Sequence, residues 1–168
     1  MNKLIFPINL SNIDANDAQF IKKLEQLDLR PILFKLVKDP DSGIPWSEHE
    51  ARLVEIEYRQ YLFLCWKYGQ NPQLAVAPNK RVDMFWHQHI LDTGKYQEDC
   101  ELLFAKPFQA LICKWLRHIL KPLGMQVYAG YMQHFPYLGL RGQKDAELLK
   151  QAFDTGKQLL DLHFPPSR

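Results

Sequence analysis

The segment from Asp83 to Cys100 concentrates the side chains of this chain that can bind a metal ion or move a proton. Within eighteen residues it carries His87 and His89 together with carboxylates, a tyrosine and a cysteine. Imidazole, carboxylate, phenol and thiol groups act as metal ligands, acids or bases when the fold brings them together. The segment is therefore the first candidate for a functional site.

The spacing divides these residues between two faces if the segment is helical. His87 and His89 then lie about 200° apart around the axis, so a regular helix cannot direct both at one metal ion. Asp83 and His87 are four residues apart and can meet on one face. The second face is the stronger candidate, and it is lined by His89, Thr93, Tyr96 and Cys100.

The first interpretation is a metal site whose ligands are His89, Cys100 and His134, with His87 as an alternative to His89. Histidine nitrogen and thiolate sulfur suit zinc or another transition metal such as copper or iron. Asp83 would then orient an imidazole ring. The wider ligand pocket predicted around this site is lined by Asp83, Trp86, His87, His89, Thr93 and Tyr96.

Two other interpretations stay open. In a cysteine-dependent enzyme, Cys100 would be a nucleophile activated by His89 or His134. In a structural arrangement, Trp86, Tyr96 and Cys100 would be core residues, and each histidine would be a buried hydrogen-bonding residue. The sequence therefore leaves open whether the protein is an enzyme.

Helical patterns account for most of the chain, and no useful β-alternation appears. Apolar spacing predicts helices over Asp17–Leu27 and Pro31–Val37, a short helix around residues 82–90, another from Asp92 or Thr93 to Phe104, and a C-terminal helix that ends before Pro165. Ser47 and Glu50 predict a capping box that opens the longest helix, which should run to about Tyr68 and be central in the fold. We therefore expect a compact all-α bundle of about six to seven helices.

Composition is that of a single globular domain over residues 1–168. The net charge of +2 indicates no particular partner, and no run of 18 apolar residues predicts a transmembrane helix. Three cysteines without paired spacing suit a reducing cytoplasm, so we expect a cytoplasmic protein.

Two stretches resemble the glycine-rich domain-containing protein-like family, which includes bacterial members. The first is Pro78-x-x-x-Val82-Asp83-x-x-Trp86-His87-x-His89-x-x-x-Thr93-x-x-Tyr96-x-x-x-Cys100, and the second is the His134–Asp145 segment. The resemblance implies a family-like core over about residues 45–104 and 130–163. The family implies no particular activity, and the glycine-rich tail that names it is absent here.

Residues 105–129 read as an insertion into this family-like core. The stretch is amphipathic and carries four basic residues, Lys106, Lys114, Arg117 and Lys121, and no acidic residue. A helix of this kind can dock on the domain or on a partner protein, and it can also lie on an anionic membrane surface. Four charges are few for nucleic-acid binding, so a protein partner is the favoured prediction. The predicted function is a small helical protein with a metal- or ligand-binding pocket, and the alternative is a non-catalytic protein-interaction module.

Overall fold

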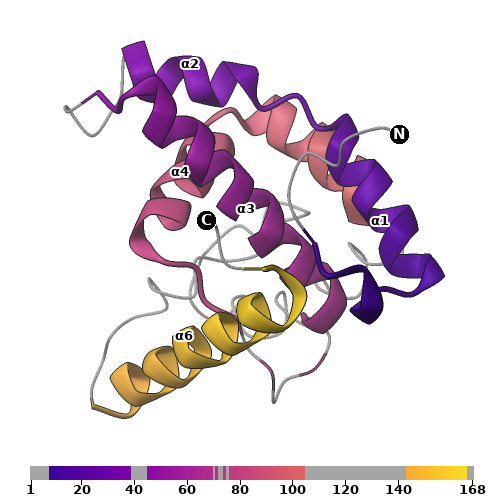
Figure 1. Cartoon of the computed structure of the whole chain (residues 1–168). Coiled ribbons are helices and arrows are strands. Elements are labelled where there is room, and N and C mark those ends of the chain that lie inside the picture. Colours follow the sequence, from indigo (N-terminus) through magenta and orange to yellow (C-terminus); the bar gives the residue numbers. More distant parts are fainter. Residues whose placement is uncertain are drawn as a thin grey trace, which may run out of the picture.

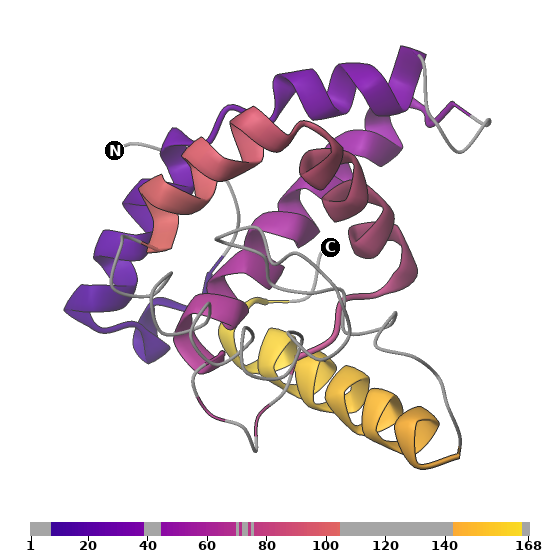
Figure 2. The ribbon, with the colours of Figure 1, turned by 180° about the vertical axis from the view of Figure 1, so that it is seen from behind.

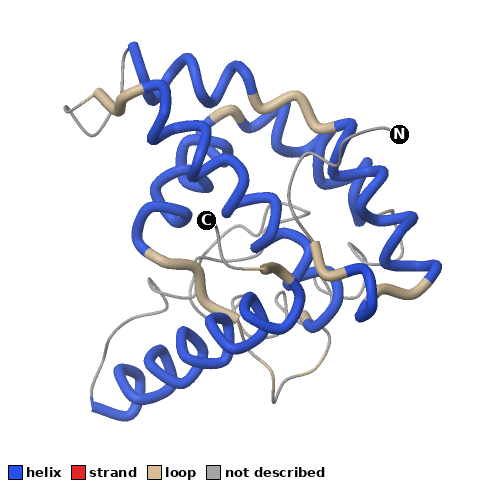
Figure 3. The backbone as a smooth tube through the Cα atoms, in the orientation of Figure 1, coloured by secondary structure: helices blue, strands red, loops and turns tan. Residues whose placement is uncertain are grey.

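The computed structural model of the chain describes residues 8–38, 45–69, 71, 74, 76–104 and 143–165, and every regular element among them is a helix. Figure 1 shows the arrangement of these helices, and Figure 3 shows that only helices and loops make up the coloured backbone. The compact all-α bundle predicted from the sequence is confirmed for this part of the chain.

The helix α3 (Glu48–Tyr68) is the centre of the bundle, because four other helices pack against it. These are α1 (Ala15–Gln26), α2 (Arg30–Lys38), α4 (Lys80–Leu91) and α6 (Gln143–His163). A short 3-10 helix, η1 (Leu10–Asn12), precedes α1, and residues 93–104 are also helical. Residues 61–65 of α3 are all buried, so this part of the helix is surrounded by protein.

The start of α3 confirms half of the predicted capping box. The Ser47 hydroxyl accepts the Glu50 N–H at 3.2 Å and so satisfies one of the unpaired donors of the first turn. The Glu50 carboxylate forms an ion pair with Arg81 of α4. Glu50 thus contributes to the contact between α3 and α4.

The helix α1 begins with a complete capping box that sequence analysis did not identify. The Asp14 carboxylate accepts the Asp17 N–H at 2.8 Å, and the Asp17 carboxylate accepts the Asp14 N–H at 3.0 Å. The helix over residues 93–104 lies beside α1 (Figure 2). Lys23 and Phe20 of α1 make this contact, since Lys23 Nζ donates to the Leu103 carbonyl at 3.4 Å and the Phe20 ring packs against Phe104.

The helix α6 is attached to the bundle along its second half. The His163 carbonyl accepts the Asn9 N–H at 2.7 Å, and the Ala152 carbonyl accepts the Ala77 N–H at 3.2 Å. Gly156 allows this close approach, because a Cβ atom there would lie 3.2 Å from the Ala77 carbonyl oxygen. The first turns of α6 extend past the other described helices in both views (Figures 1 and 2).

Among the residues described here, no helix is long and apolar enough to cross a membrane. The predicted insertion over residues 105–129, with Cys113, lies outside the described residues. His134 and most of the His134–Asp145 segment lie outside them as well.

Candidate functional site

His89 lies inside the bundle with 2% of its surface exposed, and each of its ring nitrogens has a hydrogen-bond partner. Nδ1 is 2.9 Å from the Tyr58 hydroxyl of α3. Nε2 is 2.9 Å from a carboxylate oxygen of Asp99, which belongs to the helix over residues 93–104. One histidine on α4 therefore joins three helices.

Asp99 is the charged member of this group. Its Oδ2 atom also accepts a hydrogen bond from Lys95 Nζ at 2.8 Å, one helical turn away. Burial by itself would raise the pKa of Asp99, but the hydrogen bonds from His89 and Lys95 outweigh burial and lower that pKa. An ionised carboxylate only accepts hydrogen bonds, so His89 Nε2 carries the hydrogen of its bond to Asp99.

Aromatic rings enclose the imidazole. The Tyr96 ring meets His89 edge-on with the ring centroids 4.9 Å apart, and the Tyr58 ring does so at 5.8 Å. The Trp86 indole N–H donates to the Tyr96 hydroxyl at 3.1 Å. Burial raises the pKa of Tyr58 well above its ordinary value, so its hydroxyl keeps its proton. We call the residues Tyr58, Trp86, His89, Lys95, Tyr96 and Asp99 the His89 cluster.

The chain turns at Asp92, and this turn divides the residues predicted to share one helical stripe. The helix α4 ends at Leu91, and Asp92 then begins the next helix: its carbonyl accepts the Tyr96 N–H at 2.8 Å. Thr93 lies in the first turn of that helix and is exposed. Of the four residues predicted to line one face, His89, Tyr96 and the buried Cys100 therefore lie together, and Thr93 does not.

The residues of the predicted pocket have different positions in the fold. Trp86, His89 and Tyr96 are buried and packed together, with 1%, 2% and 5% of their surfaces exposed. His87 faces solvent on the opposite side of α4, and Asp83 is half-buried. The two histidines thus lie on different faces, as their spacing predicted.

The predicted metal ligands cannot all be placed, because His134 lies outside the described residues. Within those residues, no group of three or more histidine, cysteine, aspartate or glutamate side chains is arranged to hold a metal ion. His89 would have to give up its bond to Tyr58 or Asp99 before a nitrogen could bind zinc or another transition metal. The metal site therefore stays a prediction.

Cys100 is buried, with 5% of its surface exposed. Burial raises the pKa of its thiol to about 12, against a smaller opposite effect of a hydrogen bond with Tyr96. A nucleophilic cysteine needs a lowered pKa and access to its substrate. Cys100 therefore has the properties of a packing residue. The same holds for Cys65, because burial also raises the pKa of its thiol to about 12.

Sequence reasoning missed Tyr58 and Asp99 as partners of His89. The pair Lys95 and Asp99 is a visible i,i+4 ion pair, and Tyr58 lies on the aromatic face of the central helix. The sequence did not indicate which carboxylate faces His89, because Asp83 and Asp99 both lie within ten residues of it. Only the turn at Asp92 selects Asp99.

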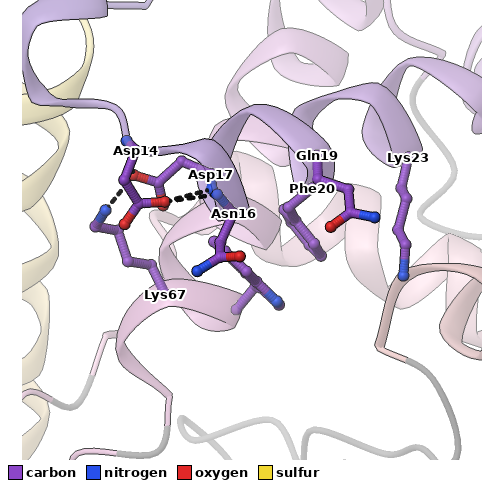
Figure 4. Close-up of a pocket in the computed structure, with 8 residues that line it drawn as sticks. Asp14, Asn16, Asp17, Gln19, Phe20, Lys23 and Lys67 are labelled. Carbon is purple, nitrogen blue, oxygen red and sulfur yellow. Dashed lines mark hydrogen bonds and ion pairs between the residues drawn. The ribbon is translucent and has the colours of Figure 1, made fainter.

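A second candidate site is a pocket between α1 and the end of α3 (Figure 4). Its volume is about 440 Å³, and it is lined by Asp14, Asn16, Asp17, Gln19, Phe20, Lys23, Trp66 and Lys67. The volume lies within the range of small-molecule sites in proteins, roughly 300–1,000 Å³. Nothing in the sequence pattern marked these residues beyond the apolar faces of two helices.

The pocket has an aromatic wall and charged ends. The rings of Phe20 and Trp66 stack with their centroids 4.4 Å apart and their planes 9° apart. Lys67 Nζ lies 2.5 Å from a carboxylate oxygen of Asp17, whose side chain is 2% exposed. In Figure 4 the side chain of Lys23 stands at the other end of the row, away from this ion pair.

The chain matches no protein-family model, no curated protein and no solved structure in the comparisons made. The resemblance to the glycine-rich domain-containing protein-like family therefore stays a prediction from the quoted residues. The fold and the two sites are described from this chain alone.

Proposed function

We propose that this protein is a non-catalytic, small-molecule-binding helical domain whose ligand occupies the pocket between α1 and α3. The observation that carries the proposal is the pocket of about 440 Å³ with the stacked rings of Phe20 and Trp66 in its wall. Apolar and aromatic walls with a few placed polar groups are typical of small-molecule sites. The site thus differs from the one predicted around His89.

The properties of the His89 cluster support a structural role for that region. Both nitrogens of His89 are bonded inside the bundle, and the thiol of Cys100 has its pKa raised by burial. A buried polar network with its groups paired rigidifies a core and specifies one arrangement of its helices. We therefore assign the cluster to holding α3, α4 and the helix over residues 93–104 together.

The wall of the α1–α3 pocket is fixed by its contacts with the core. Phe20 is 2% exposed and also packs against Phe63 and Phe104, with centroid distances of 6.4 and 5.9 Å. At one end of the pocket the side chains of Asp17 and Lys67 form an ion pair. A wall that is already ordered loses little conformational entropy when a ligand binds.

The test is a screen of aromatic fragments by ¹⁵N chemical-shift mapping on the full chain. Fragments that bind the pocket shift the backbone amides of residues 14–23 and of Trp66. Gln19→Trp, an exposed change at the pocket, should block it, whereas Lys22→Trp, an exposed change on the same helix away from the lining, should not. Absence of localised shifts, or equal binding to the Gln19→Trp variant, would contradict the proposal.

A protein-interaction module is the second candidate function, and α6 favours it. Three large apolar side chains of this helix face solvent, Leu148, Phe153 and Leu162, with 55%, 43% and 50% of their surfaces exposed. Leu148 and Leu162 lie about 40° apart around the axis of α6, so they share one side of the helix, and an apolar side of a helix can bind a partner protein. A photo-crosslinker at position 148 or 162 should then capture a defined partner that one at the exposed Lys157, on the opposite side from Leu148, does not. That partner should be lost in a Leu148→Lys/Leu162→Lys variant.

The protein-interaction proposal also includes a partner for residues 105–129 and a cytoplasmic location for the protein. The basic, amphipathic composition of residues 105–129 supports a protein partner for that stretch. Deleting residues 105–129 should then abolish binding of the partner captured through α6, if both belong to one surface.

A further inference from the structure

We infer that the ligand of the α1–α3 pocket is a small aromatic carboxylate, held by Lys23 through its charge and by Trp66, which the buried Phe20 supports, through its ring. The inference rests on the proposed function, because it names the chemical class that this pocket would select.

The two carboxylates of the lining are already used inside the protein. Asp17 pairs with Lys67 and also accepts the Asp14 N–H. Asp14 caps α1 by accepting the N–H groups of Asn16 and Asp17 at 2.8 Å each. The hydrogen bond from the Asp17 N–H is the main cause that lowers the pKa of Asp14. Asp14 is therefore ionised, and the positive end of the α1 dipole compensates its charge.

Lys23 is the lining cation that these carboxylates do not neutralise. Its Nζ atom makes a long hydrogen bond of 3.4 Å to a neutral acceptor, the Leu103 carbonyl. Among the described residues its ammonium group makes no ion pair, and an ammonium has three donors. Its other two donors thus have no partner in the part of the chain that the structure describes, and the group that matches a positive charge with free donors is an anion.

The helix α1 directs Lys23 and the aromatic wall to the same side. Asn16, Phe20 and Lys23 follow one another at spacings of four and three residues, and Gln19 is four residues before Lys23, so they form one face. Figure 4 shows Gln19, Phe20 and Lys23 projecting from the same side of the helix. A flat ring against Trp66 and a carboxylate at Lys23 can therefore belong to one small molecule, with the Gln19 amide at its edge.

The experiment compares benzoate with benzamide, which has the same ring and no charge, by isothermal titration and ¹⁵N shift mapping on the full chain. Benzoate should bind in the pocket and benzamide at least about tenfold more weakly, because a hydrogen bond to a charged group outweighs a neutral one. Lys23→Gln should weaken benzoate binding by about tenfold and leave benzamide unchanged. The affinity for benzoate should also fall as salt is added.

The matched control is Lys22→Gln, which removes the same charge from the exposed neighbouring position. It should leave benzoate binding within about twofold of the original, because an exposed charge pointing elsewhere is screened. Equal effects of the two lysine variants, or equal binding of benzoate and benzamide, would overturn the inference. The salt dependence of the unmodified protein gives the same answer if Lys23→Gln is poorly folded.

The ligand class and the proposed function fail in different ways. If neutral aromatic fragments bind the pocket and benzoate does not, the carboxylate inference is wrong and the small-molecule function stands. If no fragment of any charge perturbs residues 14–23, both are wrong.

Discussion

Replacing Tyr58 by phenylalanine tests whether the His89 cluster is a structural junction. The change removes one oxygen atom from a side chain that is 0% exposed and leaves the ring in place. The hydroxyl lies 2.9 Å from His89 Nδ1, so the variant leaves a buried ring nitrogen without its partner. It keeps the bond between His89 and Asp99.

The expected cost follows from that orphaned nitrogen. A buried polar atom left without a hydrogen bond costs about 1 to 3 kcal/mol of folding free energy. Loss of about 2 kcal/mol in a protein of this size lowers the unfolding midpoint by about 4 to 8 °C. Tyr61→Phe is the matched control, since Tyr61 is a buried tyrosine of the same helix whose hydroxyl meets the weak sulfur partner Cys65. It should cost less than about 1 kcal/mol.

The assay is equilibrium urea unfolding followed by far-UV circular dichroism, under reducing conditions. Tyr58→Phe is then combined with His89→Leu, and the double variant should be less destabilised than the sum of the singles by about 1 kcal/mol or more, as for residues in direct contact. A cost of Tyr58→Phe within about 0.5 kcal/mol of zero, the usual effect of surface changes, would refute the reasoning. So would strictly additive effects of the two substitutions.

Three further results are expected. Cys65 and Cys100 should resist iodoacetamide in the folded protein and react after denaturation, as read by peptide mass spectrometry, because burial raises both thiol pKa values to about 12; rapid labelling of either in the folded state would contradict this. Lys67→Met should lower the free energy of unfolding by about 1 to 3 kcal/mol, because it removes the cation that bonds to the buried Asp17 carboxylate, and urea unfolding measures the loss. Burial, and then the charge of Lys67, lowers the pKa of His163, so the unfolded chain binds a proton that the folded one resists; stability should be complete above about pH 6.5 and fall as the pH drops below it. A His163→Gln variant should lose part of this pH dependence in the same unfolding assay, and an unchanged profile would show that another group causes it.

The sequence by itself determined the helices and most of their ends. The cap at Ser47 begins α3 where it was expected, and the helix ends at Tyr68 as predicted, because capping depends on residues within one turn of the helix end. The longest helix was predicted to be central, and the contacts of α3 with four other helices confirm this. Local chemistry and helical periodicity were sufficient for these features.

The sequence also separated His87 from His89 correctly, because two positions on a helix differ by a fixed angle. It could not determine that His89 bonds to Tyr58 and Asp99. That choice depends on the direction in which the chain leaves Asp92, and on a residue that lies 31 positions away in the sequence.

Tertiary structure alone decided where the pocket lies. Phe20 and Trp66 are 46 residues apart in the sequence, and each reads as an ordinary apolar position of its own helix. Their stack forms only when α1 packs against the end of α3, and the same packing pairs Asp17 with Lys67. The charge left on Lys23 is visible only after that pairing is known, because the sequence lists charges without showing which of them neutralise each other.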